Sequence, residues 1–260
     1  MVNKIWEDMH EYNYDADRHS TTYEPLSLSA MYLSDFFPNY PDLGGFLNSF
    51  NFKLSFTQHI RMINKHFDNA KLYYKMSMSN NVNAIFPVDS PEYNILSSQP
   101  STLHMYKFEI EEMIFHMRRV LDALVQVTYL ITNSCEFDTC KEIKYDSIGS
   151  AFSSKRKCPN LYLIIFGGDG EYLSDKTDFI QIINDLFNSF KHSLIHDESH
   201  PIMGESIPTV ITFYAKKGKY EKIIYHNHNL IHIMMGFHDT VVRILENQKK
   251  FLSKCSGTKC

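Results

Sequence analysis

The chain has 260 residues, a mass of 30.4 kDa and a formal net charge of −4, which fits one large domain or two small ones. This charge gives no general attraction to nucleic acid, so nucleic-acid binding would need a local basic patch. With only 10 glycines, folds built on glycine-rich nucleotide loops are disfavoured. The longest apolar run, residues 161–166, is too short to span a membrane, and the N-terminus lacks the apolar part of a signal peptide. We therefore expect a cytoplasmic protein without membrane contact.

Residues 1–53 are expected to form an N-terminal arm with short helices. Their first part is polar and aromatic without a regular period, and prolines and a glycine pair interrupt the short apolar pieces that follow. Residues 54–254 are expected to form one helical domain with a β-hairpin inserted at 209–225. No repeat or change of composition divides this region further.

Four long helices are predicted from apolar residues that recur at intervals of three and four. The predicted helices cover residues 54–79, 104–133, 177–196 and 229–252. In the second of them the pattern continues from Ile110 to Ile131, so this helix should be central. The fold class is therefore mainly α, with the four helices in an antiparallel bundle. A loop is expected at 80–102, where prolines and serines are frequent.

A short strand and a β-hairpin are predicted in the segments between the helices. Residues 161–166, LYLIIF, predict a short strand that ends in a glycine-rich turn, Gly167 to Gly170. This turn lacks the Gly-Lys-Ser/Thr ending of a P-loop and the G-x-G-x-x-G spacing of a dinucleotide site. Residues 209–225 predict the hairpin, because two β-branched and aromatic arms flank a glycine-containing turn at 216–219.

The helix at 104–133 carries a polar stripe opposite its apolar face. The stripe consists of Glu109, Glu112, His116, Arg119 and Gln126, with Arg118 and Asp122 beside it. One interpretation is a solvated face with Glu112–His116 and Arg118–Asp122 pairs one helical turn apart. The other is that Arg119 or Asp122 faces a polar site shared with the helix at 177–196. Both interpretations remain open.

Two patterns have spacings that can bind a metal ion. Cys135 and Cys140 form one C-x4-C pair and Cys255 and Cys260 another, and both pairs would lie at the same end of the bundle if the helices that precede them run parallel. His228-x-x-x-His232 would place two imidazoles one helical turn apart, but it lacks the glutamate of a zinc-peptidase motif. We expect incidental thiols and surface or capping histidines here, and no metal or cofactor.

The candidate catalytic residues lie near the end of the helix at 177–196. Lys191, His192 and His196 form a basic-polar-x-x-x-His arrangement. This arrangement resembles that of the HEPN superfamily of helical-bundle proteins, many of which are metal-independent ribonucleases. The resemblance covers the helices at 104–133 and 177–196. It implies that Lys191 stands where the family has arginine, His192 where it has a polar residue and His196 where it has the catalytic histidine.

The resemblance has further implications. A charged residue on the preceding long helix often completes the site in this family, and Glu112, Arg119 and Asp122 are the candidates. The resemblance also implies that RNA is the substrate and that the protein is a homodimer. It further implies a toxin–antitoxin or anti-phage role, with an antitoxin or defence partner protein.

The chemistry of these residues fits RNA cleavage. Attack by the 2′-OH of RNA needs an acid or base that works near neutral pH, which histidine supplies, and a cation beside the phosphate. Lysine is a point charge where arginine would bind two oxygens, so weaker activity or none is expected. The alternative is a non-catalytic binding or scaffold protein, in which His196 and Lys191 stabilise the C-terminal end of the helix. A metal-dependent enzyme that uses the histidines between 192 and 232 is less favoured.

Overall fold

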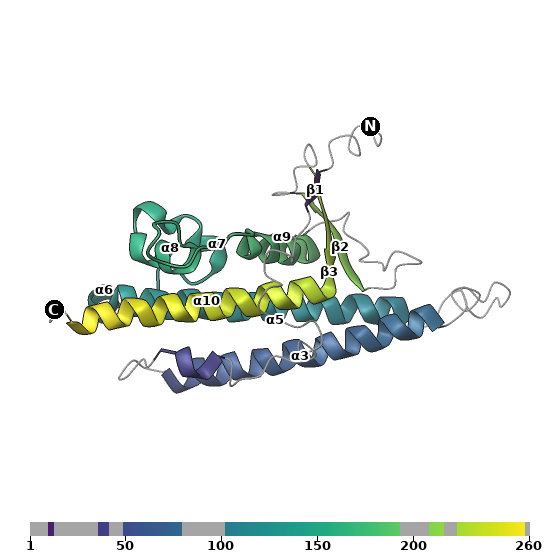
Figure 1. The fold of residues 1–260 in the computed structure, drawn as a ribbon, viewed down its shortest axis with the longest axis horizontal. Helices are drawn as coiled ribbons and strands as arrows, with labels where there is room; N and C mark the ends of the chain where they lie inside the picture. Colours follow the sequence, from purple (N-terminus) through teal and green to yellow (C-terminus); the bar gives the residue numbers. More distant parts are fainter. Residues whose placement is uncertain are drawn as a thin grey trace.

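The computed structural model describes residues 10–12, 36–41, 49–79, 102–192, 208–215 and 223–257. In these ranges the chain is mainly helical, with one small sheet (Figure 1). The α-helices are α3 (Ser49–Ser79), α5 (Thr102–Thr132), α6 (Ser134–Cys140), α7 (Ile148–Ala151), α8 (Pro159–Phe166), α9 (Phe179–His192) and α10 (Leu230–Gly257). The 3-10 helices are η4 (Phe37–Asn39) and η6 (Ser154–Arg156), and the strands are β1 (His10–Tyr12), β2 (Thr209–Ala215) and β3 (Ile223–Asn229). None of the helices within the described ranges has both the length and the apolarity that crossing a membrane requires.

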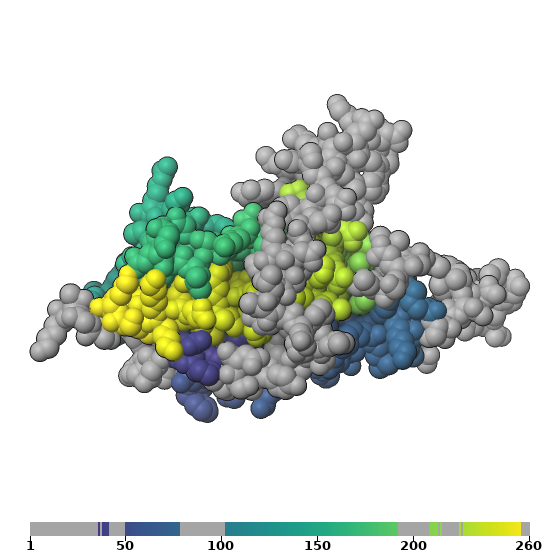
Figure 2. Space-filling view, viewed as in Figure 1, coloured from purple at the N-terminus to yellow at the C-terminus, as the bar shows by residue number. Residues whose placement is uncertain are grey.

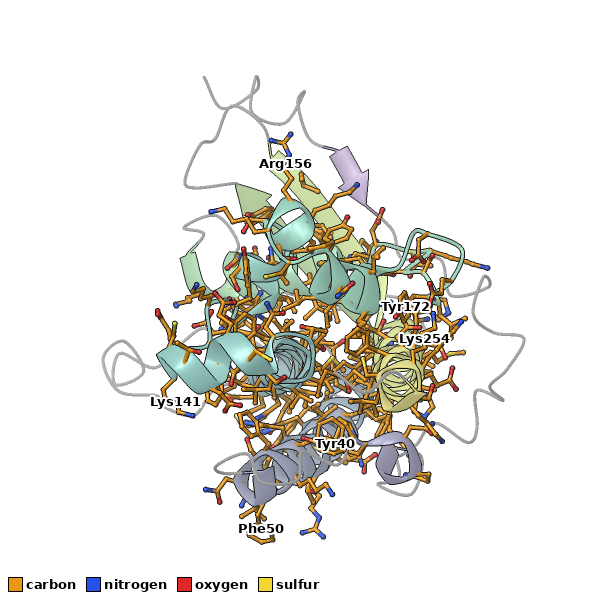
Figure 3. The ribbon with its side chains drawn as sticks, turned by 90° about the vertical axis from the view of Figure 1, so that its left-hand side faces the viewer. Tyr40, Phe50, Lys141, Arg156, Tyr172 and Lys254 are labelled. Atoms are coloured by element: carbon orange, nitrogen blue, oxygen red, sulfur yellow. The ribbon has the colours of Figure 1, made fainter. Side chains whose placement is uncertain are left out.

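The three longest helices run along the long axis of the molecule (Figure 1). α5 lies at the centre and contacts α3, α8, α9 and α10, as the sequence predicted for this helix. α7, α8 and α9 cover it on the side away from α3, which the end-on view makes plain (Figure 3). α10 crosses one face of the molecule, between the α6–α9 segment and the side where α3 and η4 lie (Figure 2).

The apolar periodicity of the sequence corresponds to the observed core. All residues of the predicted α3 seam are buried, namely Phe56, Ile60, Ile63, Phe67, Ala70 and Tyr74. On α5 the seam is buried from Ile110 to Thr128, and on α9 Phe179, Ile183 and Leu186 are fully buried. Burial of these side chains is the main favourable contribution to folding, at roughly 1.5–3 kcal/mol for each large aliphatic or aromatic group.

Buried amides of α10 fix this helix against its neighbours. Gln248 donates to the Thr128 hydroxyl at 2.9 Å. Asn247 donates to the Ile164 carbonyl at 3.0 Å, and its side-chain oxygen accepts from the Leu173 amide at 2.9 Å. The Asn247 bonds satisfy a carbonyl in the last turn of α8 and an amide in the segment that follows α8, while Gln248 joins α10 to α5.

The sheet confirms the predicted hairpin and adds a strand to it. β2 and β3 pair antiparallel, with Thr209 opposite Asn229 at one end and Ala215 opposite Ile223 at the other. The predicted turn at 216–219 lies outside the described residues. β1 pairs parallel with β3, which was not predicted. The Ser189 and Thr212 hydroxyls lie 2.6 Å apart and join α9 to β2.

Two predictions about the elements need correction. Residues 161–166 form helix α8 and not a strand; Pro159 occupies its first turn and Gly167 follows its end with φ +76°. α3 begins at Ser49, five residues before the predicted start at 54 and inside the predicted N-terminal arm. Residues 80–101 of the predicted loop lie outside the described residues. Its last residue, Thr102, is the first residue of α5.

Candidate functional site

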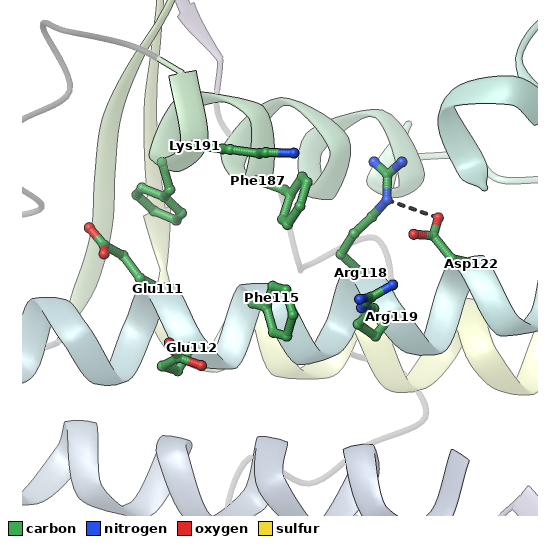
Figure 4. Close-up of a pocket in the computed structure, with 9 residues that line it drawn as sticks. Glu111, Glu112, Phe115, Arg118, Arg119, Asp122, Phe187 and Lys191 are labelled. Carbon is green, nitrogen blue, oxygen red and sulfur yellow. Dashed lines mark hydrogen bonds and ion pairs between the residues drawn. The ribbon is translucent and has the colours of Figure 1, made fainter. Parts of the chain in front are cut away.

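Two adjoining pockets form a groove along α5, which we call the α5 groove. The first pocket, of about 430 Å³, lies between α5 and α9 (Figure 4). Its lining is Glu111, Glu112, Phe115, Arg118, Arg119, Asp122, Phe187, Phe190 and Lys191. The second, of about 540 Å³, lies between α5 and α3, and the two pockets share Phe115, Arg119 and Asp122. Both volumes fall in the range of small-ligand sites.

The start of α9 is fixed by a carboxylate, and this determines where Lys191 lies. Asp175 accepts from the Phe179 and Ile180 amides, both at 3.2 Å, and so caps the helix. The apolar face of α9 is buried in the core, and Ser189 is buried against β2. Lys191, in the last turn, is therefore left exposed at the pocket.

Cationic groups and phenyl rings alternate in the first pocket. The rings of Phe115 and Phe187 have centroids 6.2 Å apart. The Arg118 guanidinium lies 5.3 Å and the Lys191 ammonium 5.9 Å from the centroid of the Phe187 ring. The Arg119 guanidinium lies 5.4 Å from that of Phe115. Cations at these distances are attracted to the ring faces, so the rings help to hold the three charges in one place.

Arg118 and Arg119 are neighbours in sequence but have different surroundings. Arg118 is buried and donates to Asp122 at 2.9 Å and to Asn184 at 2.5 Å. Arg119 is exposed and makes no hydrogen bond or ion pair with any other described residue. A cation with free donors in a groove is available to a ligand, whereas Arg118 has its donors occupied.

Asp122 is part of a structural network. Its carboxylate accepts from Arg118 and, at 2.8 Å, from the Ile148 amide at the start of α7. Burial raises the pKa of this carboxyl, although Arg118 and the Ile148 amide act in the opposite direction. The predicted Arg118–Asp122 pair is thus present, and it joins α5 to α7 and, through Asn184, to α9.

The predicted site residues can now be located. Lys191, Arg119 and Asp122 line one pocket, as expected if the two helices share a polar site. The side chain of His192, the last residue of α9, and the whole of His196 lie outside the described residues. Glu112, the other sequence candidate, lines the same pocket.

No protein-family model matches the chain, and the comparisons with curated proteins and with solved structures found no match either. The HEPN resemblance stays a prediction.

The structure describes part of the two cysteine pairs and both histidines that the sequence suggested as metal ligands. Cys135, Cys140 and Cys255 are exposed free thiols, and α6 lies at the same end of the molecule as the C-terminal end of α10 (Figure 1). Cys260 lies outside the described residues. His228 belongs to β3 whereas His232 belongs to α10, so the pair is not one helical turn apart, as its spacing had suggested.

Part of the polar stripe on α5 is not solvated, contrary to one interpretation of the sequence. Glu109 and His116 face α3, where they meet His66 and His59. Sequence reasoning missed this cluster. The signals were the seven-residue spacing of His59 and His66, which puts both on one face of α3, and the four-residue spacing of Glu112 and His116 on α5.

Proposed function

We propose that the α5 groove binds RNA and that the protein is a HEPN-like endoribonuclease whose cleavage reaction needs no metal ion. One observation carries this proposal. Lys191 from the end of α9 and Arg119 from α5 line the same pocket, beside the rings of Phe115 and Phe187. Lys191 and Arg119, two of the residues that the sequence suggested for catalysis, are therefore close enough to act on one ligand.

The composition of the pocket fits single-stranded RNA. Cations that follow a phosphate backbone, together with aromatic rings on which bases stack, are the usual means of binding single strands. The ammonium of Lys191 points away from Glu111 and toward Phe187 (Figure 4), on the side of the pocket where the two arginines lie. A phosphate would be held there, because Arg119 has free donors and Lys191 adds a second charge.

In the proposed reaction Lys191 stabilises the negative charge that develops on the phosphate when the 2′-OH attacks it. His196, assigned from the sequence alone, exchanges protons with the 2′-OH or the leaving oxygen. Asp122 does not react; it positions Arg118 and the start of α7. Arg119 binds the substrate.

The proposal extends to the assembly. We infer that α3, α5, α9 and α10 correspond to the antiparallel four-helix bundle expected from the sequence, with α5 in contact with each of the other three. A homodimer, and a role in a toxin–antitoxin or anti-phage system with an antitoxin or defence partner protein, follow from the resemblance and belong to the same proposal.

A non-catalytic binding or scaffold protein is the second candidate, and it needs only the structural role of the charged residues. Arg118, Asp122 and Asn184 form a closed network that joins α5, α7 and α9. Such a network stabilises a helical module whether or not the module is an enzyme. In this case the groove would bind RNA or another anionic ligand without cleaving it.

Cleavage of total RNA and of tRNA in excess EDTA distinguishes the two candidates. The wild type should cleave both, while Lys191→Ala and His196→Ala should lose this activity. Lys65→Ala is the matched control, because Lys65 is an exposed lysine of α3 that lines neither pocket. If a folded wild-type protein leaves RNA intact, or if both active-site variants cleave as the wild type does, the catalytic proposal is wrong.

A further inference from the structure

Five side chains that can bind protons or metal ions gather between α3 and α5, on the side of α5 away from α9. Nδ1 of His59 lies 2.7 Å from Nδ1 of His116, and Nδ1 of His66 lies 2.6 Å from a carboxylate oxygen of Glu109. The rings of His66 and His116 stack, with centroids 5.4 Å apart and planes 17° from parallel. The fifth residue, Glu112, is exposed and precedes His116 by one helical turn.

Three of these residues have the arrangement of a metal-ligand set. One ligand atom from each of His66, Glu112 and His116 lies within 4.8 Å of the others, and no other such group occurs in the part of the chain that the structure describes. Zinc ligands about 2.1 Å from the ion lie roughly 3.4 Å apart in a tetrahedral site. The exposed Glu112 side chain can close this gap by changing its rotamer, because nothing in the core holds it.

Hydrogen bonding determines which nitrogen of His66 is available. Its Nδ1 is occupied by Glu109, so Nε2 remains for a ligand. This Nε2 is buried and forms no hydrogen bond with any described residue. A buried polar atom without a partner costs free energy, and a bound ion would remove that cost. In His116, Nδ1 is engaged with His59, which likewise leaves Nε2.

We propose that His66, Glu112 and His116 bind one divalent transition-metal ion, with zinc as the expected occupant. Two imidazoles and one carboxylate are a common zinc set, and three protein ligands leave a fourth position for water or another ligand. This inference does not depend on RNA cleavage. Glu112 lines the first pocket together with Lys191, but His66 and His116 line neither pocket, and the proposed cleavage proceeds in EDTA.

Glu109 and His59 act as positioning residues in this site. A carboxylate that accepts from one nitrogen of a ligating histidine fixes its tautomer and orientation, and Glu109 stands in that relation to His66. Nδ1 of His59 lies 2.7 Å from Nδ1 of His116 and restrains that imidazole, with its Nε2 left for the ion.

The first test is calorimetric titration of EDTA-stripped, full-length protein with zinc chloride. The exposed thiols are first alkylated with iodoacetamide, because they bind zinc on their own. Glu112→Gln and His116→Gln should each bind one ion fewer than the wild type, or bind it at least tenfold more weakly. The matched controls are Glu111→Gln, which is adjacent to Glu112, and His104→Gln, which lies in the first turn of the same helix. They should bind zinc as the wild type does.

Glu112 is exposed, so Glu112→Gln should leave the fold intact, as circular dichroism will check. Equal zinc binding by Glu112→Gln and the wild type would overturn the proposal, as would a wild type that binds no zinc after alkylation. The cluster would then be a hydrogen-bonded layer that joins α3 to α5.

A second readout uses cobalt, whose visible absorption reports its ligands. Glu109→Gln should weaken cobalt binding by about 10–100-fold and shift the absorption bands, while Glu109→Asp should restore part of the affinity. A purely structural Glu109 would leave the bands of the bound cobalt unchanged, and that result would contradict its positioning role.

Discussion

Two adjacent arginines of α5 differ in their environment and therefore in their expected roles. The side chain of Arg118 is 9% exposed, and its guanidinium is shared between Asp122 and Asn184. Arg119 is exposed over the Phe115 ring in the groove. Removing one partner of a buried ion pair leaves the other charge without compensation, whereas an exposed arginine contributes little to stability.

Alanine should destabilise the protein much more at position 118 than at position 119. Arg118→Ala should lower the free energy of unfolding by about 3 kcal/mol, because Asp122 loses its cation. Arg119→Ala should change it by less than about 0.5 kcal/mol. Urea unfolding followed by circular dichroism measures both. Equal losses at the two positions would show that Arg118 is not the structural partner of Asp122.

At the scale of elements, α8 shows why periodicity alone misassigned one segment. LYLIIF has the β-branched and aromatic composition of a buried strand, and six residues are too few for a helical period to be visible. The usable signals lay at its ends, in Pro159 and Gly167. The long helices were predictable because their seams repeat over several turns.

Gly167 should tolerate substitution less well than Gly170. Both have a left-handed backbone, with φ of +76° and +77°. A Cβ on Gly167 would lie 2.5 Å from Cα of Ser174, whereas a Cβ on Gly170 would meet no atom within 4 Å. Gly170→Ala should therefore cost about 1 kcal/mol from backbone strain, and Gly167→Ala more than this. Thermal unfolding compares them, and a smaller loss for Gly167→Ala would contradict the observed packing.

The histidine and glutamate cluster could not be assembled from the sequence. His66 and Glu109 are 43 residues apart, and their contact depends on the register between α3 and α5. Spacing could place His59 and His66 on one face of a helix but could not identify the face of α5 opposite them. The three-residue strand β1 was equally inaccessible, because its pairing with β3 is long-range.

At the scale of the whole molecule, buried histidines make stability depend on pH. His226 and His228 are about 1% exposed, and Nδ1 of His226 lies 3.1 Å from Nε2 of His228. Burial lowers the pKa of His226 to about 4 and that of His228 to about 3, from an ordinary value of 6.5. Both are neutral in the folded state at pH values where the unfolded chain is protonated.

Stability should therefore fall as the pH is lowered from 6.5 toward 4, because the unfolded state binds more protons in this window. His226 alone should account for a loss of about 2 kcal/mol between pH 7.5 and pH 5. Urea unfolding in EDTA at these two pH values measures the loss, and His226→Phe should reduce it by this amount. An unchanged pH dependence in His226→Phe would contradict the burial of a neutral histidine.

The chain carries a net charge of −4, so RNA binding depends on the local charges of the α5 groove. Anisotropy of a labelled single-stranded RNA with 2′-O-methyl groups, which prevent cleavage, tests this claim most directly. In EDTA and low salt the wild type and Lys65→Ala should bind alike. Arg119→Ala, Lys191→Ala and Phe115→Ala should each raise Kd about fivefold or more, as expected for the loss of a phosphate contact or a stacked base. If the wild type binds no RNA, or if all five proteins bind it equally, the groove is not the RNA-binding site.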